Sequence, residues 1–193
     1  MSVSKEALLK LQDSRKLREE LNLVMRWRIL TSKGGIARLV AYQDSRDVQK
    51  ILDHVCGPEN WENEPLNLNG KMYMSIKIKT EDGWVSRSDV GTETQVEAVK
   101  GEASDAFKRA AVMWGIFRDI YEIDYIILKT NGRDPMTPEG LVLETPTAIT
   151  AYCNGISKPM GLLRNLYNSM KPVPENISEA VKLIKEYINE RHI

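Results

Sequence analysis

Cysteine is scarce in this sequence, with two residues, Cys56 and Cys153, among 193. The two lie far apart, and neither belongs to a C-x-x-C pair. A disulfide framework needs several paired cysteines, and a zinc site needs closely spaced ligands. The sequence therefore predicts reduced, partly buried thiols, with neither a disulfide framework nor a metal site.

Long apolar runs are also missing, as is the basic, apolar and small-residue pattern of a signal peptide. A transmembrane helix needs about 20 consecutive, mainly apolar residues. We therefore expect a cytoplasmic protein with no membrane partner.

Net charge is zero, which on its own argues against a strongly electrostatic nucleic-acid binder. The charge is nevertheless segregated along the chain. Residues 1–50 hold 11 Lys and Arg against 6 Asp and Glu, whereas residues 51–70 hold four acids and no base. This segregation permits one basic groove on a neutral chain, although solvated helix faces that differ in charge explain the count equally well.

Motifs of nucleotide-dependent enzymes and deaminases are absent, because the chain has no G-x-x-x-x-G-K-[ST] and no H-x-E followed by P-C-x-x-C. Glu62 and Glu64 share one face of a predicted strand, but no third metal ligand follows at a recognisable spacing. His54 and Cys56, two apart on a predicted helix, do not face each other. We predict that the protein is not an enzyme and needs no cofactor.

The local patterns predict an α+β fold made of a β-hairpin, a helix, and a three-stranded antiparallel meander packed on a long helix, with a helical C-terminal appendage. A first helix is expected over residues 4–22, and Asp44 and Gly57 bound the helix after the hairpin. Strands are expected over residues 24–30, 36–42, 61–68, 71–80 and 84–90. In domain terms, residues 1–129 form the core domain with its N-terminal helix, residues 130–146 a linker or loop, and residues 147–193 the appendage.

The long helix is expected to begin at Thr92, with Gln95 completing a capping box. Three- and four-residue spacing places its apolar residues on one core-facing stripe; they are Val96, Val99, Ala103, Ala106, Phe107, Ala110, Met113 and Trp114. Lys108 lies nearly opposite this stripe and Arg109 on its flank, so both heads can reach an anionic partner.

The strand KMYMSIKIKT alternates between apolar and polar residues, which gives it one core face and one solvated, basic face. Lys77, Lys79 and Tyr73 share the solvated face, where they can track a phosphate backbone and stack a base. An ordinary solvated sheet face is the alternative. The four tryptophans are expected to be core or subunit-interface residues rather than base-stacking platforms; they are Trp27, Trp61, Trp84 and Trp114.

Three motifs in order carry a family resemblance: Val55-Cys-Gly-Pro-Glu-Asn-Trp61, Asp89-Val-Gly91 and Ser104-Asp-Ala-Phe-Lys-Arg-Ala-Ala-Val-Met-Trp-Gly115. Together with the predicted elements, over about residues 24–125, they resemble the Rad-fifty-two family of single-strand annealing proteins. The sequence looks closest to bacterial and phage members, including the DNA-damage-response DdrA type.

The resemblance implies a non-enzymatic protein that binds single-stranded DNA in a basic groove and anneals strands without ATP, in homologous recombination or DNA repair. It also implies homo-oligomeric rings or helices, in a bacterial or phage-infected cytoplasm. Lys108 and Arg109 fall on the family's DNA-contacting pair, and Tyr42 and Arg46 lie near a region that contributes to the groove. Eukaryotic members have a further arginine where this chain has Val112. Charge and strand alternation add Arg28, Lys33, Arg38, Lys77 and Lys79 as candidates.

Three other functions remain open on the sequence alone. A double-stranded-RNA-binding module also has a three-stranded sheet followed by a helix with a basic start. A DNA-end-protecting protein would bind single strands without annealing them, and a purely structural oligomer would bind no nucleic acid. The C-terminal helical pieces, with Ile177, Val181, Ile184 and Ile188 on one face, are expected to recruit a recombination or replication protein.

Overall fold

A computed structural model describes residues 2–92, 98–137 and 140–154 of the chain. The chain divides into two compact units, each built from two separate segments. The first unit comprises Met1–Val24 and Gln43–Ile120, and the second comprises Met25–Tyr42 and Tyr121–Ile193. The expected role of Gln95 in a capping box and the expected helices after residue 154 lie outside the described residues.

The first unit begins with two short helices, α1 (Lys5–Lys10) and α2 (Ser14–Glu20), where the sequence predicted one helix over residues 4–22. That prediction is wrong because Asp13 starts a new helix. Its carboxylate accepts a hydrogen bond from the Lys16 backbone N–H at 3.2 Å, as an N-cap does. Leu9, an apolar residue of α1, is 64% exposed.

Helix α3 (Ser45–Cys56) follows the expected pattern. The Asp44 carboxylate accepts the Arg46 backbone N–H at 3.0 Å, and Gly57 ends the helix at a φ of 82°, which favours glycine. The Pro58–Asn60 turn (η1) then reverses the chain, and the Asn60 side chain donates to the Cys56 carbonyl at 2.9 Å. The Gly-Pro-Glu-Asn motif is therefore a helix stop and a turn.

A three-stranded antiparallel sheet comes next, in the order β3-β4-β5. Its strands are β3 (Trp61–Leu68), β4 (Lys71–Thr80) and β5 (Gly83–Val90). Asn69 and Gly70 both have positive φ and form a tight turn in the two-residue gap between the expected strands 61–68 and 71–80. Met74, Ile76 and Ile78 of β4 are buried, as their alternation predicted.

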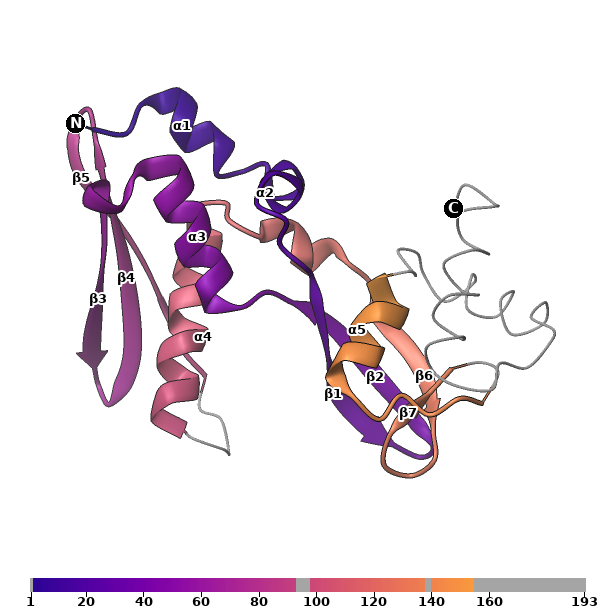
Figure 1. The fold of residues 1–193 in the computed structure, drawn as a ribbon. Coiled ribbons are helices and arrows are strands. Elements are labelled where there is room, and N and C mark those ends of the chain that lie inside the picture. Colours follow the sequence, from indigo (N-terminus) through magenta and orange to yellow (C-terminus); the bar gives the residue numbers. More distant parts are fainter. Residues whose placement is uncertain (1, 93–97, 138–139, 155–193) are drawn as a thin grey trace. The chain divides into compact units, whose positions relative to one another are not determined.

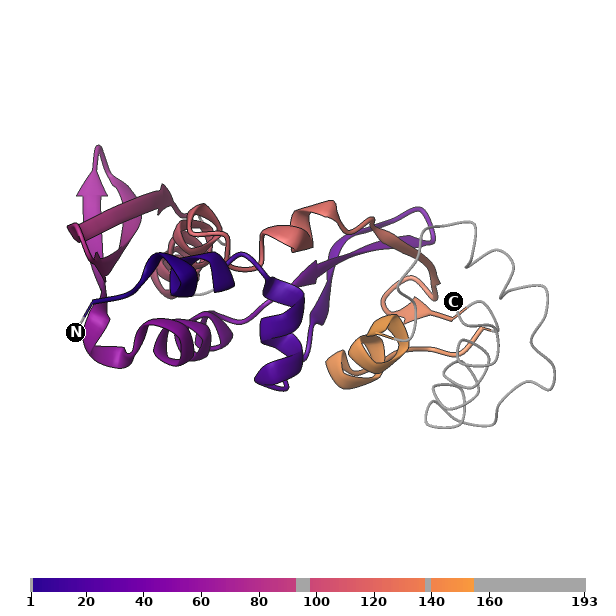
Figure 2. The same ribbon diagram turned by 90° about the horizontal axis from the view of Figure 1, so that it is seen from above.

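Helix α4 (Ala98–Met113) packs against β4 and β5, and α3 lies beside both α1 and α4 (Figures 1 and 2). Ala106, Phe107, Ala110 and Trp114 enter the same core as Ile76, in agreement with the predicted stripe. Met113 departs from the described part of this stripe, because the residue is 46% exposed, and Val96 lies outside the described residues. A 3-10 turn, η2 (Arg118–Glu122), follows α4.

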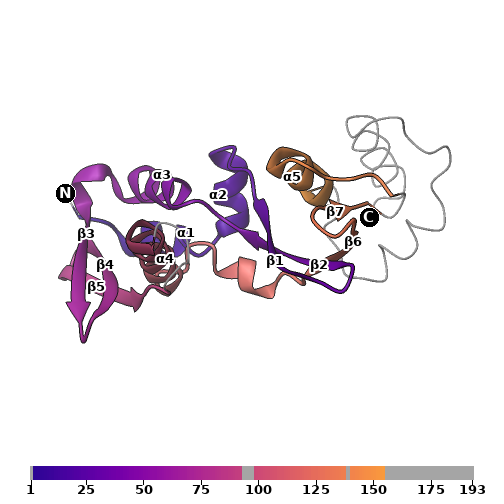
Figure 3. The same ribbon diagram turned by 90° about the horizontal axis from the view of Figure 1, so that it is seen from below.

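The second unit contains a sheet of order β1-β2-β6-β7, covered on one face by α5 (Pro146–Asn154) (Figure 3). Its strands are β1 (Arg26–Lys33), β2 (Ile36–Tyr42), β6 (Ile126–Thr130) and β7 (Pro135–Met136). Trp27, Leu39, Leu128 and Tyr152 are buried between the sheet and α5. The Trp27 indole N–H donates to the Asn154 side chain at 3.1 Å, so this tryptophan is a core residue, as expected.

The α+β class is confirmed, but the compact units differ from the predicted continuous core of residues 1–129. The reason is non-local pairing. Strand β2 pairs with β6, so Ala37 lies opposite Leu128, and the hairpin joins the chain that follows residue 120. Part of the predicted linker, Pro135–Met136, is a short strand of the same sheet.

No helix within the described ranges is long and apolar enough to cross a membrane.

Candidate nucleic-acid interface

One side of α4 is tied to the sheet by polar contacts from residues on successive turns. The Glu102 carboxylate accepts the Met72 backbone N–H at 3.1 Å. The Asp105 carboxylate accepts the Thr92 backbone N–H at 3.1 Å and its hydroxyl at 2.8 Å. Gly91 allows the close approach, because a Cβ there would lie 2.3 Å from the Glu102 carbonyl oxygen. These contacts position α4 beside β5. We call the surface where Glu102 and Asp105 of α4 approach Gly91 and Thr92, at the end of β5, the α4–β5 seam.

Arg109 lies on this seam and pairs with Asp89. Its Nη2 is 3.3 Å and 3.4 Å from the two carboxylate oxygens, and the side chains are 38% and 27% exposed. Its Nε is buried without a hydrogen-bond partner among the described residues. Lys108, next in sequence, is half-buried. Arg109 therefore shares its charge with a neighbouring carboxylate, which the sequence alone did not reveal.

A third cation on the seam, Arg87 of β5, was missed by the sequence reasoning. Its guanidinium carbon lies 4.9 Å from the centroid of the Trp114 ring. Trp114 is fixed in turn, because its indole N–H donates to the Ile76 carbonyl at 3.1 Å. The available signal was alternation, since Arg87 and Asp89 are two apart on one strand and so share a face.

The second unit presents a basic sheet face, opposite the face that α5 covers. Strands β1, β2 and β6 contain no aspartate or glutamate. Arg28 lies opposite Val40, Arg38 opposite both Thr31 and Ile127, and Lys33 opposite Ile36. The cations of these three strands are Arg26, Arg28, Lys33, Arg38 and Lys129. We call this surface the basic sheet face.

A β-bulge between Ile29 and Thr31 is what aligns these cations. Strict alternation would place Arg28 and Lys33 on opposite faces of β1. The bulge shifts the register by one residue, so both side chains face the same way as Arg38. The structure thus brings together three of the predicted site residues and adds Arg26 and Lys129.

Tyrosines accompany the cations on this unit. The Arg28 guanidinium carbon is 6.0 Å from the centroid of the Tyr42 ring, at the end of β2. Tyr125, which directly precedes β6, is 52% exposed, and sequence reasoning did not single it out. Cations together with aromatic rings are the composition that binds single-stranded nucleic acid, although Tyr42 itself is half-buried.

Arg46 belongs to the first unit, whereas Tyr42 belongs to the second. Arg46 is exposed in the first turn of α3.

The solvated face of β4 is less basic than predicted. Glu62 and Glu64 of β3 lie 3.2 Å and 2.8 Å from the Lys77 Nζ, and these contacts raise the pKa of Lys77, with Glu64 the larger cause. The prediction of a basic surface at Lys77 is corrected, since the neutralising acids come from the neighbouring strand. Lys79 remains exposed, opposite Trp84. Trp84 is 49% exposed, so it is not part of this chain's core.

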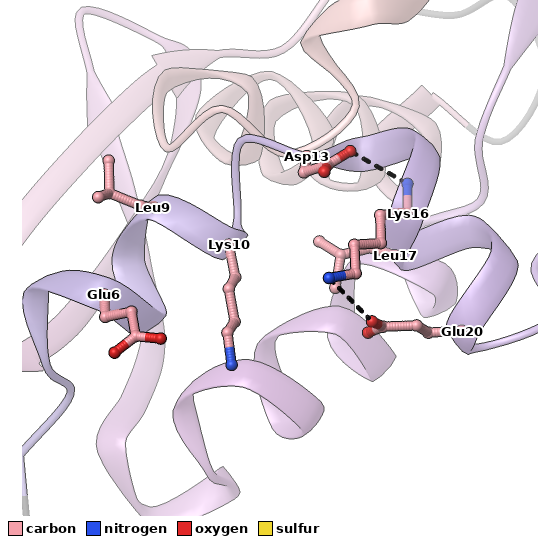
Figure 4. Close-up of a pocket in the computed structure, with 7 residues that line it drawn as sticks. All are labelled: Glu6, Leu9, Lys10, Asp13, Lys16, Leu17 and Glu20. Atoms are coloured by element: carbon pink, nitrogen blue, oxygen red, sulfur yellow. Dashed lines mark hydrogen bonds and ion pairs between the residues drawn. The ribbon is translucent and has the colours of Figure 1, made fainter.

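A hollow of about 280 Å³ lies between α1 and α2 (Figure 4). It is lined by acids and bases in similar number, and the Lys16 ammonium lies 3.8 Å from the Glu20 carboxylate at its edge. This mixed charge favours no anionic or cationic ligand. Within the described ranges, His, Cys, Asp and Glu nowhere gather in a group of three or more able to hold a metal ion.

Comparison with known proteins identifies relatives of most of the described chain. Residues 13–135 match the family model described as Rad52/22 family double-strand break repair protein. A single-stranded DNA-binding protein DdrA from Deinococcus deserti is 33% identical over 117 residues, which cover 58% of this chain and 58% of that protein. The protein of the same name from Deinococcus radiodurans is 39% identical over 89 residues, or 45% and 42% of the two chains.

The chain thus spans about half the length of the curated relatives it matches. The family match is longer. It covers more than half of the sequence, and it includes the basic sheet face as well as the α4–β5 seam. The resemblance carried by the three sequence motifs is confirmed, and this chain belongs to the Rad52/22 family of double-strand break repair proteins.

Proposed function

We propose that this protein binds single-stranded DNA and anneals complementary strands without ATP, in homologous recombination or DNA repair. The main observation behind the proposal is the basic sheet face, on which Arg28, Lys33 and Arg38 of two paired strands face the same way. Family membership and the names of the two relatives support it.

The physical basis is neutralisation of phosphate charge. Two DNA strands repel each other, and cations that replace their condensed counterions reduce this repulsion. A protein that grips the backbone leaves the base edges free to pair with a second strand. Tyrosine rings on the same unit, the half-buried Tyr42 and the exposed Tyr125, add stacking that tolerates any base. A chain of zero net charge can act in this way because its cations are grouped.

Each unit contributes its own contacts. On the second unit we assign phosphate contacts to Arg28, Lys33 and Arg38, and base stacking to Tyr42. On the first unit we assign phosphate contacts to Lys108 and Arg109, with Arg46 and Lys79 as further exposed cations. Lys77 is left out because two glutamates already hold its ammonium.

We further infer that the protein acts without a catalytic step or a cofactor, in the cytoplasm, and as a homo-oligomeric ring or helix. Repetition of a modest basic site around such an assembly would raise the affinity for a long strand through multivalency. The C-terminal residues 147–193 are proposed to recruit a recombination or replication protein.

The test is an annealing assay with two complementary, unstructured DNA strands, without ATP, across a salt series. The wild-type protein should accelerate duplex formation, and the acceleration should fade as salt rises. The double variant R28Q/R38Q should bind single strands more weakly. The magnitude of the slope of log affinity against log salt should decrease by about 1.4, because each of the two lost phosphate contacts accounts for about 0.7.

A matched control is R15Q/K16Q, which removes the same charge from exposed positions on α2. Both control residues already pair with glutamates one helical turn away, so their loss should leave binding unchanged. Strand binding without acceleration of annealing would support the end-protecting role instead. Preference for duplex RNA in competition would support the RNA-binding module, and no binding at low salt would contradict the proposal.

A further inference from the structure

Arg87 differs from Arg18 and Arg109, two arginines of the first unit that pair with carboxylates, in what its guanidinium contacts. Arg18 pairs with the Asp119 carboxylate through both terminal nitrogens, and its side chain is 12% exposed. Arg109 pairs with Asp89. Arg87 is exposed, and within the described part of the chain its guanidinium has the Trp114 ring, not a carboxylate, as its partner. Its charge is thus the less neutralised of the two arginines on the seam.

The Trp114 ring contacts the Arg87 guanidinium without occupying the N–H groups of that guanidinium. A guanidinium that stacks on an aromatic face keeps its in-plane N–H donors directed outward. Those donors form a planar fork that matches two oxygens of a phosphate. Trp114 is 8% exposed and hydrogen-bonded to β4, so it is a fixed support. Less side-chain freedom is then lost when Arg87 binds an anion.

Position places Arg87 beside the two cations already assigned to DNA. Arg87 and Asp89 are two apart on β5, so their Cα atoms are about 6.6 Å apart and their side chains share a face. Asp89 contacts Arg109, and Lys108 precedes Arg109 on α4. The seam therefore brings Arg87 and Arg109 to the same face of β5, and Lys108 adjoins Arg109 in the sequence. Asp89 pairs directly with Arg109.

We propose that Arg87 binds a phosphate of the single-stranded DNA backbone from the face of Trp114, as the third cation of the α4–β5 seam; this rests on the single-strand binding proposed above. Arg87 makes the stronger contact of the two arginines, because Arg109 must share its charge with Asp89.

The test uses the full-length chain and a short fluorescent oligothymidine, with binding measured by anisotropy over a salt series. Arg87→Met keeps an apolar side chain over Trp114 but removes the charge, and Arg87→Lys keeps a charge. R87M should bind roughly three- to tenfold more weakly, with a salt slope lower by about 0.7. R87K should retain most of the slope. The control Arg15→Met, an exposed arginine that pairs with Glu19, should behave as wild type.

The outcomes separate this role from a purely structural one. If the wild-type protein binds the oligonucleotide and R87M binds it with the wild-type affinity and salt slope, the proposed role of Arg87 is overturned. The proposed function would still stand in that case. If R87M loses thermal stability, its binding is compared with wild type at a temperature where both are fully folded. Weaker binding by R87M with an unchanged salt slope would then show that Arg87 only covers the ring. Failure of the wild-type protein to bind would overturn both proposals.

Discussion

Neutralising Asp89 is expected to strengthen DNA binding, although it removes an ion pair. The substitution Asp89→Asn keeps the size of the side chain. It also keeps an oxygen that can accept the Val90 backbone N–H, now 2.7 Å from the carboxylate. What it removes is the negative charge 3.3 Å from Arg109. A phosphate that approaches this guanidinium is repelled by the same carboxylate.

The size of this effect follows from Coulomb's law. A phosphate on the open side of the Arg109 guanidinium would lie ~6 Å from the Asp89 carboxylate, which gives ~0.7 kcal/mol at the dielectric constant of water and ~2.8 kcal/mol at an effective value of 20. The side chains are 38% and 27% exposed, so the lower part of this range applies. A gain of ~1 kcal/mol is about fivefold in affinity. The lost ion pair should cost at most about 1 kcal/mol of unfolding free energy.

The assay is anisotropy of a short fluorescent oligothymidine, together with urea unfolding of the same variant. Affinity should rise about fivefold, and the salt slope should steepen by up to ~0.7, since Arg109 then displaces a counterion of its own. The matched control is Asp82→Asn, the same change at an exposed turn residue about 23 Å along β5. Weaker or unchanged binding by D89N would refute the reasoning, because Asp89 would then act only by holding Arg109 in place.

Three further predictions concern the first unit. Gly91→Ala should loosen α4 and lower both stability and strand binding, because the added Cβ meets the Glu102 carbonyl; thermal unfolding and anisotropy check this. Ser14→Ala should cost about 1–3 kcal/mol in urea unfolding, since the buried Ser14 hydroxyl accepts the Phe117 N–H at 2.7 Å and its loss leaves that donor unpaired. Burial, helped by a nearby aspartate, raises the pKa of the Cys56 thiol to about 12, so at pH 8 a thiol reagent should label this residue much faster in urea than in the native protein; fast native labelling would contradict this.

Much of the local structure was predictable because its signals lie close together in the sequence. The Asp44 cap, the Gly57 stop and the Asn69–Gly70 turn each depend on backbone groups within a few residues. The alternation of Met74, Ile76 and Ile78 follows from the two-residue period of a strand. The same locality explains the error over residues 4–22, where a hydrophobic pattern continued across a helix break at Asp13.

The candidate sites were predictable only in part. Sequence selected Arg28, Lys33 and Arg38 by charge, but it took the bulge in β1 to place them on one face. Sequence also selected Lys77, yet its charge is engaged by acids on a neighbouring strand. Arg87 went unnoticed because the alternation that places it on one face with Asp89 does not show that Trp114 lies beside it.

The sequence by itself determined the helix and strand types, the turn chemistry and the motif order that indicates the family. The tertiary structure decided which distant segments meet. The pairing of β2 with β6 and the contact of Arg87 with Trp114 join residues far apart along the chain. Such contacts depend on register and packing across the whole fold, whereas hydrophobic periodicity and capping report only on neighbouring residues.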